Sequence, residues 1–157
     1  MGAITNIADE VRELILDEWV KQGHNLTGSY MEKFNYKISS MSGGIKVEYF
    51  DKTDKSYGAI INAGVRADQI LYPYARKRIV GLTNWVELRL GLSGKEAISV
   101  AYAIATKHAR EGMPTPASVR FSQTGKRTGF VEDSTKNVTE IIERNFAQKI
   151  KDTIKWQ

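Results

Sequence analysis

The sequence predicts an α+β fold built as a single domain of 157 residues. Apolar residues recur at helical spacing near both ends and in the centre of the chain, and apolar and polar residues alternate between residues 30 and 49. The lack of a linker or an internal repeat favours one domain. We therefore expect an antiparallel β-hairpin packed by an N-terminal helix, central helices and a long C-terminal helix.

The N-terminal helix is expected to begin at Thr5 or Asn6, either of which can act as its N-cap, and to close at Gly23. Its apolar stripe contains Ile7, Val11, Leu14, Ile15 and Trp19. A connector, residues 24–28, leads into the hairpin. One side of the hairpin carries Tyr30, Phe34, Tyr36 and Ile38 on the first strand and Ile45, Val47 and Tyr49 on the second, with a turn at residues 42–44.

The middle of the chain combines an ambiguous segment with two clearer helices. Residues 57–65 are apolar with many small side chains, and their periodicity fits either a short helix or a strand. Residues 66–77 contain Pro73 and are expected to form an extended loop, anchored on the body of the protein by Tyr72 and Tyr74. A helix follows at 79–90. A capping box of Ser93 and Glu96 then opens another helix that ends at Gly112.

The last part of the chain is turn-rich and then helical. Residues 113–133 contain prolines and glycines, and we expect an extended loop of the kind that is usually functional or flexible. A final helix is expected at 134–155. Its apolar stripe consists of Val138, Ile141, Ile142, Phe146, Ile150 and Ile154.

The residue types argue against catalysis. The chain has no cysteine, and its two histidines, His24 and His108, have no second ligand at metal spacing, so we interpret both as surface residues at helix ends. The acids Asp51, Asp54, Glu132 and Asp133 are interpreted as solvated charges of turns and helix starts. We expect no catalytic residue, no cofactor and no metal. A divalent-metal enzyme using Asp51 or Asp133 is the least favoured alternative.

The charge of the chain suggests an acidic partner. The formal net charge is +5, and no run of 18 apolar residues or secretory signal is present, so no membrane partner is expected. The predicted DNA-facing residues are Arg120, Lys126 and Arg127, in the loop 113–133. The glycines at 125 and 129 favour a solvent-exposed loop over a phosphate-binding one. Residues 76–78, Arg-Lys-Arg, form a second basic cluster.

Four short motifs occur in an order that resembles a known family. They are Asn25-Leu26-Thr27-Gly28-Ser29 before Tyr30, the segment from Tyr57 to Val65, Gly112-Met113-Pro114-Thr115-Pro116, and Gly125-Lys126-Arg127-Thr128-Gly129-Phe130. In this order they resemble the tail-completion and head–tail joining proteins of long-tailed bacteriophages. Two features depart from that pattern: the helical region 79–112 is longer than in compact members, and Asn62 stands where an acid is frequent.

The resemblance implies a structural virion protein, made in the host cytoplasm and assembled into the phage neck or tail. Such subunits form rings, commonly hexamers, between connector and tail-tube proteins, with a lumen that DNA crosses in transient, unspecific contact. We expect assembly contacts from the hairpin edges, from the loop 113–133 and from two sets of residues. These are Tyr57, Gly58, Asn62 and Gly64, and then Met113, Pro114, Phe121 and Phe130. The alternatives are a stand-alone, unspecific nucleic-acid-binding protein and a component of a phage-derived particle.

Overall fold

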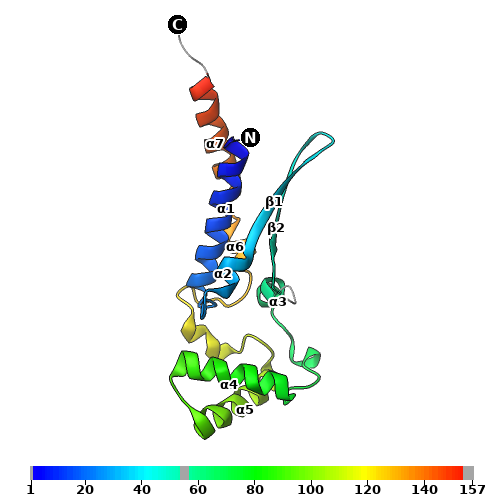
Figure 1. The fold of residues 1–157 in the computed structure, drawn as a ribbon, viewed down its shortest axis with the longest axis vertical. Coiled ribbons are helices and arrows are strands. Elements are labelled where there is room, and N and C mark those ends of the chain that lie inside the picture. The colour runs from blue at the N-terminus through cyan, green and yellow to red at the C-terminus, as the bar shows by residue number, and fades with distance from the viewer. Residues whose placement is uncertain (1, 54–56, 154–157) are drawn as a thin grey trace.

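A computed structural model describes residues 2–53 and 57–153 of the chain and confirms the predicted α+β class. The described residues form helices and one two-stranded antiparallel sheet. Figure 1 shows an elongated molecule: α1 and α7 lie side by side toward one end, the β-hairpin projects beside them, and α4 and α5 form the other end. The hairpin therefore stands on a helical body and is not covered by it.

Helix α1 (Gly2–Lys21) begins earlier than the sequence predicts. Thr5 and Asn6 lie inside the helix, so the predicted N-cap is wrong. The end is correctly placed: Gly23 has a φ of 76°, and its amide and that of His24 donate to the carbonyls of Val20 and Trp19. This left-handed closure turns the chain back toward the body of the protein.

The first predicted strand begins later than expected. Helix α2 (Ser29–Lys33) precedes β1 (Phe34–Met41), so Tyr30 lies on a short helix instead of a strand. From there its ring stacks on Trp19, with 4.0 Å between the ring centroids. Strand β2 (Gly44–Asp51) pairs with β1 in antiparallel register, and the pairing of Met41 with Gly44 leaves a two-residue turn. The hairpin and its turn are thus confirmed.

The middle of the chain contains more helix than its periodicity suggests. Residues 57–65 begin with helix α3 (Tyr57–Ala63), which resolves the choice between helix and strand. The expected extended loop 66–77 contains the 3-10 helix η1 (Ala67–Gln69), and α4 (Arg76–Leu90) starts within it. Helix α5 (Gly94–Glu111) packs on α4. Ser93 is its N-cap, but the side chain makes no capping hydrogen bond, so the predicted capping box is wrong.

Small side chains let α4 and α5 approach closely. Ala97, Ala101 and Ala105 are fully buried at a spacing of four residues, which places them on one face of α5. The buried residues of α4 are Ile79 and Val86. Among the described helices, none is long and apolar enough to span a membrane.

The segment 113–133 differs from an extended loop. It contains the 3-10 helix η2 (Pro116–Phe121) and the start of helix α6 (Phe130–Ser134). The final helix is divided as well, because a turn separates α6 from α7 (Val138–Thr153). On α7 the side chain of Ile141 is buried, whereas Ile142, Phe146 and Ile150 are exposed. Ile154 of the predicted stripe lies outside the described residues.

An aromatic cluster around Trp19 forms the centre of the main core. Phe130 meets the Trp19 indole edge-on at 5.1 Å, and the Tyr30 ring stacks on the same indole. Phe34 continues the stack from Tyr30 at 5.5 Å. Trp19 and Phe130 are at most 1% exposed. This cluster joins α1, α2, β1 and α6 in one hydrophobic unit.

Replacing Phe130 with alanine tests this core. We expect Phe130→Ala to lower the free energy of unfolding by about 3–5 kcal/mol, because a fully buried ring leaves a cavity. Phe146→Ala is the matched control, because the Phe146 ring lies on α7 and is 44% exposed. We expect this substitution to change the free energy of unfolding by no more than about 0.5 kcal/mol. Urea denaturation of the two variants measures the difference. Equal losses would contradict the placement of Phe130 in the core.

Candidate assembly surfaces

The base of the hairpin is fixed to α1 by tyrosine side chains. The Tyr36 hydroxyl donates to Asp9 Oδ1 at 2.7 Å, and the Tyr49 hydroxyl donates to the carbonyl of Ala8 at 3.1 Å. Partial burial raises the pKa of Tyr49 to about 12, so this hydroxyl stays protonated as a donor. The side chain of Arg12 also donates to the carbonyls of Met31 and Phe34. These contacts hold the first half of the hairpin at a defined angle.

The distal half of the hairpin has no such cover. Register pairs Ile38 with Val47 and Ser40 with Ile45, which places these side chains on one face of the sheet. Ile38 is 38% exposed and Ile45 53% exposed. Within the described residues each strand pairs only with the other, so the outer edges of both strands carry unpaired backbone groups. The distal hairpin therefore presents an apolar face between two open edges.

A second uncovered surface follows α7. Ile142, Phe146 and Ile150 recur every four residues and are all exposed, so they form one apolar stripe along the helix. Another side of α7 contacts α1. There Arg144 of α7 pairs with Glu10 of α1, and the Asn145 side-chain amide donates to the same carboxylate. This pairing lowers the pKa of Glu10. The helix is therefore fixed in place, with its apolar stripe turned outward.

Asn62 links the two segments that the sequence nominates for assembly. Its side-chain amide donates to both carboxylate oxygens of Glu132, at 3.0 and 2.8 Å, and its Oδ1 accepts from the amide of Val131 at 2.9 Å. The Asn62 carbonyl accepts from the amide of Gly129. An acid at position 62 would face Glu132 with like charge. The asparagine is therefore suited to this contact within the chain.

The neighbouring residues continue the same internal contact. Val65 and Met113 exchange two backbone hydrogen bonds of 2.7 Å, forming an isolated antiparallel bridge. Gly64 has a φ of 73° and packs against the Met113 carbonyl and Pro114, which leaves no room for a side chain. Segments 57–65 and 112–133 thus bind one another in the single chain.

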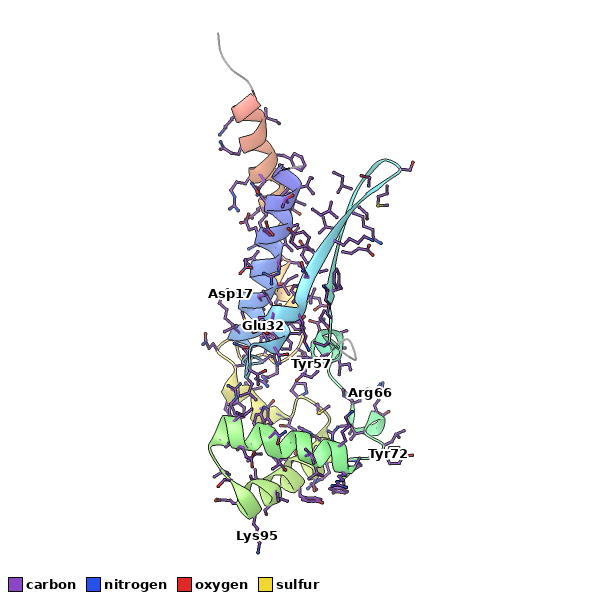
Figure 2. All side chains as sticks on the ribbon, in the orientation of Figure 1. Asp17, Glu32, Tyr57, Arg66, Tyr72 and Lys95 are labelled. Carbon is purple, nitrogen blue, oxygen red and sulfur yellow. The ribbon has the colours of Figure 1, made fainter. Side chains whose placement is uncertain are left out.

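The other nominated residues also have partners inside the chain. Phe130 is a core residue, and Gly58 lies against the Tyr30 ring, where any side chain would clash. Tyr57 contacts Trp19 edge-on at 6.1 Å, and Phe121 contacts Trp85 at 5.5 Å. The ring of Tyr57 remains 49% exposed at the level of α3 (Figure 2). That the predicted assembly residues contact a second chain remains a prediction.

The three predicted DNA-facing residues are not equivalent. Lys126 pairs with Asp133 at 2.8 Å, which lowers the pKa of that carboxyl. The Arg127 guanidinium donates to the Gln22 carbonyl at 2.7 Å and is half-buried, and burial lowers its pKa. Arg120 lies over the Phe121 ring at 4.8 Å. Arg127 is thus partly withdrawn from solvent, whereas Lys126 and Arg120 remain exposed.

Both histidines lie near helix ends, as predicted, but neither is a simple surface residue. His24 is half-buried against Trp19, and burial together with Arg127 and Arg89 lowers its pKa to about 4. Nδ1 of His108 accepts a hydrogen bond from the Arg78 guanidinium at 3.1 Å, and burial and that arginine lower the pKa of His108 to about 4. Both imidazoles are therefore neutral at pH 7. Sequence reasoning missed these arginine neighbours because they come from distant segments.

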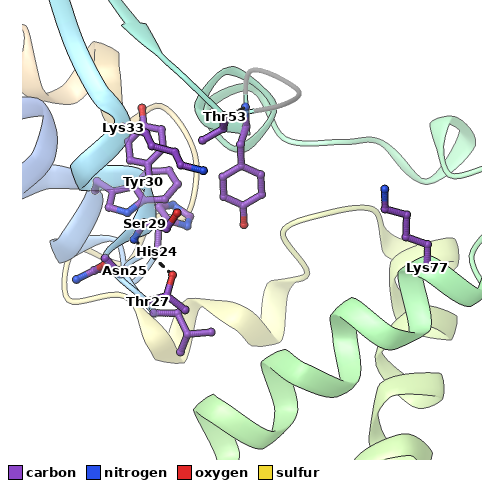
Figure 3. A pocket seen from close by; sticks show the side chains of 12 residues that line it. His24, Asn25, Thr27, Ser29, Tyr30, Lys33, Thr53 and Lys77 are labelled. Atoms are coloured by element: carbon purple, nitrogen blue, oxygen red, sulfur yellow. Dashed lines mark hydrogen bonds between the residues drawn. The ribbon is translucent and has the colours of Figure 1, made fainter.

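A surface hollow lies between the connector 24–29 and α4 (Figure 3). It has a volume of about 500 Å³, and its lining includes Trp19, His24, Tyr30, Tyr57, Lys33 and Lys77. Among the described residues that line it there is no carboxylate. The part of the chain that the structure describes also contains no group of three potential metal ligands.

Comparison with known proteins does not assign the chain to a family. No family model matches it, and no curated protein or solved structure is significantly similar to it. The resemblance to phage neck proteins therefore rests on the order of its short motifs.

The Asn62 contact can be tested by substitution. We expect Asn62→Asp to lower the free energy of unfolding by about 1–3 kcal/mol, because the amide donors are lost and two carboxylates then face each other. Asn84→Asp is the control, since Asn84 is exposed on α4 and should change stability by less than about 0.5 kcal/mol. Thermal or urea unfolding measures both. A neutral Asn62→Asp would contradict the contact with Glu132.

The buried histidines predict a loss of stability in mild acid. Because the folded-state pKa of each is about 4, the unfolded chain, with a histidine pKa near 6.5, binds more protons between these values. Stability is therefore complete above pH 6.5 and falls as the pH drops toward 4. We expect about 1–2 kcal/mol for each histidine, allowing for partial exposure.

Urea denaturation at a series of pH values measures this effect. His24→Gln and His108→Gln should each remove about half of the pH dependence between pH 6.5 and about 4.5. The carboxyls of Glu10 and Asp133 have lowered pKa values and stay ionised over most of this interval. A wild-type stability that is flat across the interval would contradict the burial of both imidazoles.

Proposed function

We propose that this chain is a non-catalytic structural protein of a tailed-phage virion, a ring-forming subunit of the neck or tail-completion region. The observation that carries the proposal is the distal hairpin: its apolar face and both of its edges have no cover among the described residues. An exposed apolar strand edge is a liability in an isolated protein and an asset in an assembly. The order of the sequence motifs adds the resemblance to phage neck proteins.

The position of the uncovered surfaces suits a ring. The hairpin and the apolar stripe of α7 are different surfaces of one subunit. A contact between unlike surfaces of neighbouring subunits repeats around an axis, and it forms a ring when the rotation closes. Such a heterologous contact requires no symmetry within the subunit. Both surfaces stand on elements that are fixed to α1, so their relative direction is defined before assembly. Connector and tail-tube proteins would bind the two faces of the ring.

A stand-alone nucleic-acid-binding protein is the alternative. It predicts binding by a monomer and does not require the exposed distal hairpin. The experiment for the proposed function therefore concerns self-association through the hairpin, and uses no nucleic acid.

The test is a double substitution in the distal hairpin, Ile38→Asp with Ile45→Asp. At high protein concentration we expect closed rings of the natural sequence in negative-stain electron microscopy and sedimentation, and monomers of the double variant. The melting temperature should change little, because both side chains are already exposed. Leu88→Asp is the control, since Leu88 is 62% exposed on α4, away from the hairpin.

Two results would contradict the proposal. One is a natural sequence that stays monomeric at high concentration, together with its absence from purified virions by mass spectrometry. The other is association that survives the hairpin substitutions and is lost with Leu88→Asp, which would move the contact to α4.

A further inference from the structure

An exposed aromatic corner lies where the chain enters α4, at the end of the molecule away from the hairpin. Leu71 is 75% exposed and Tyr72 78% exposed, the highest values among the large apolar residues that the structure describes. Figure 2 shows Tyr72 at the outer edge of the molecule beside the start of α4. The sequence suggests that Tyr72 anchors the loop, but its side chain contacts no other ring and makes no hydrogen bond among the described residues, and its carbonyl accepts from the amide of Ala75. The expected anchoring by Tyr72 is therefore wrong.

Tyr74 anchors the loop to the body of the protein, as the sequence predicts, and it extends the aromatic surface onto α5. Its hydroxyl contacts the hydroxyl of Thr106 at 3.0 Å, and its ring stacks with Tyr102 at 6.1 Å and an interplanar angle of 27°. Tyr74 and Tyr102 each remain about half exposed. The loop is thus held by one tyrosine, and the neighbouring one is presented to solvent.

Unpaired cations surround this corner. Arg76 and Lys77 follow at the start of α4, and Arg110 lies four residues beyond Thr106, on the same face of α5 as Tyr102. All three are exposed, and none forms an ion pair among the described residues. The acids nearby are already used, because Asp68 pairs with Arg66 and Glu111 with Lys107. The corner therefore combines free aromatic rings with uncompensated positive charge.

We propose that this corner binds single-stranded nucleic acid, with phosphates held by Arg76, Lys77 and Arg110 and an unpaired base stacked on Tyr72. Exposed aromatic rings next to a basic surface are the combination that binds single strands without reading sequence. Phosphates are the anions that unpaired guanidinium and ammonium groups attract most generally. The inference adds a surface to the proposed assembly role and does not depend on ring formation.

The corner has advantages over the basic residues of the loop 113–133. Lys126 and Arg127 are held by Asp133 and by the Gln22 carbonyl, so binding a phosphate would require their release. Arg76, Lys77 and Arg110 have no such partner to give up. The structure therefore favours α4 and α5 over the loop as the surface that contacts nucleic acid.

Fluorescence anisotropy with the full chain tests the proposal. The probes are a fluorescein-labelled single-stranded oligonucleotide of mixed sequence and a duplex of the same length, each titrated at several salt concentrations. We expect tighter binding to the single strand, and binding about 5- to 100-fold weaker for Tyr72→Ala. The triple variant Arg76→Gln, Lys77→Gln, Arg110→Gln should make the slope of log affinity against log salt shallower by about 2.

Matched controls separate this surface from net charge and from general apolar exposure. Lys95→Gln, Arg120→Gln, Lys126→Gln removes the same number of charges elsewhere, and Phe146→Ala removes an exposed ring from α7. Both controls should bind nearly as well as the natural sequence. Circular dichroism checks that every variant is folded.

Three results would overturn the proposal. The first is no binding to either probe at low salt, and the second is equal loss in the triple variant and its charge-matched control. The third is single-strand binding by Tyr72→Ala that equals that of the natural sequence, which would show that no base stacks on this ring. None of these results bears on ring formation through the hairpin, so the two proposals can fail separately.

Discussion

Tyr30 and Phe130 both pack on the indole of Trp19, the first stacked at 4.0 Å and the second edge-on at 5.1 Å. These three rings come from α2, α6 and α1, so one buried side chain joins the N-terminal helix to the base of the hairpin and to the segment before α7. Aromatic pairs of this kind contribute about 0.5–1.5 kcal/mol beyond the burial of their surface. The angle at which the hairpin leaves the body depends on this packing.

The contacts that the end of α1 makes with α4 and with the segment 113–133 are directional polar bonds. Arg127 and Arg89 donate to the carbonyls of Gln22 and Gly23, at the end of α1, and the amide of Gln123 donates to the carbonyl of Lys21. These bonds satisfy carbonyls that a helix end leaves without partners. They also keep two guanidinium groups close to each other, which contributes to the low pKa values of His24 and Arg127.

Sequence patterns were most informative where an element is decided by its own residues. The spacing of Ile7, Val11 and Ile15 predicts α1, and the residues 42–44 predict the tight turn of the hairpin, because periodicity and turn chemistry are local. They fail where the conformation of a residue depends on a partner that is distant in the sequence. Tyr30 follows an alternating pattern, yet it lies on a helix where it meets Trp19. For the missing side-chain bond of Ser93 the structure gives no physical reason. The candidate site shows the same limit: Asn62 was nominated by its motif, but its partner Glu132 is distant in sequence and carries no signal of the pairing.

The pairing of α1 with α6 and α7 has a consequence for the order of folding during synthesis. The hairpin closes through a two-residue turn, and α4 and α5 are consecutive, so both can form from residues that leave the ribosome close together. The apolar face of α1 must instead wait for Phe130 and Ile141, which are made near the end of the chain. Until then Trp19 has Tyr30 on one side and lacks Phe130 on another, so part of the apolar face of α1 is open to aggregation in the nascent chain.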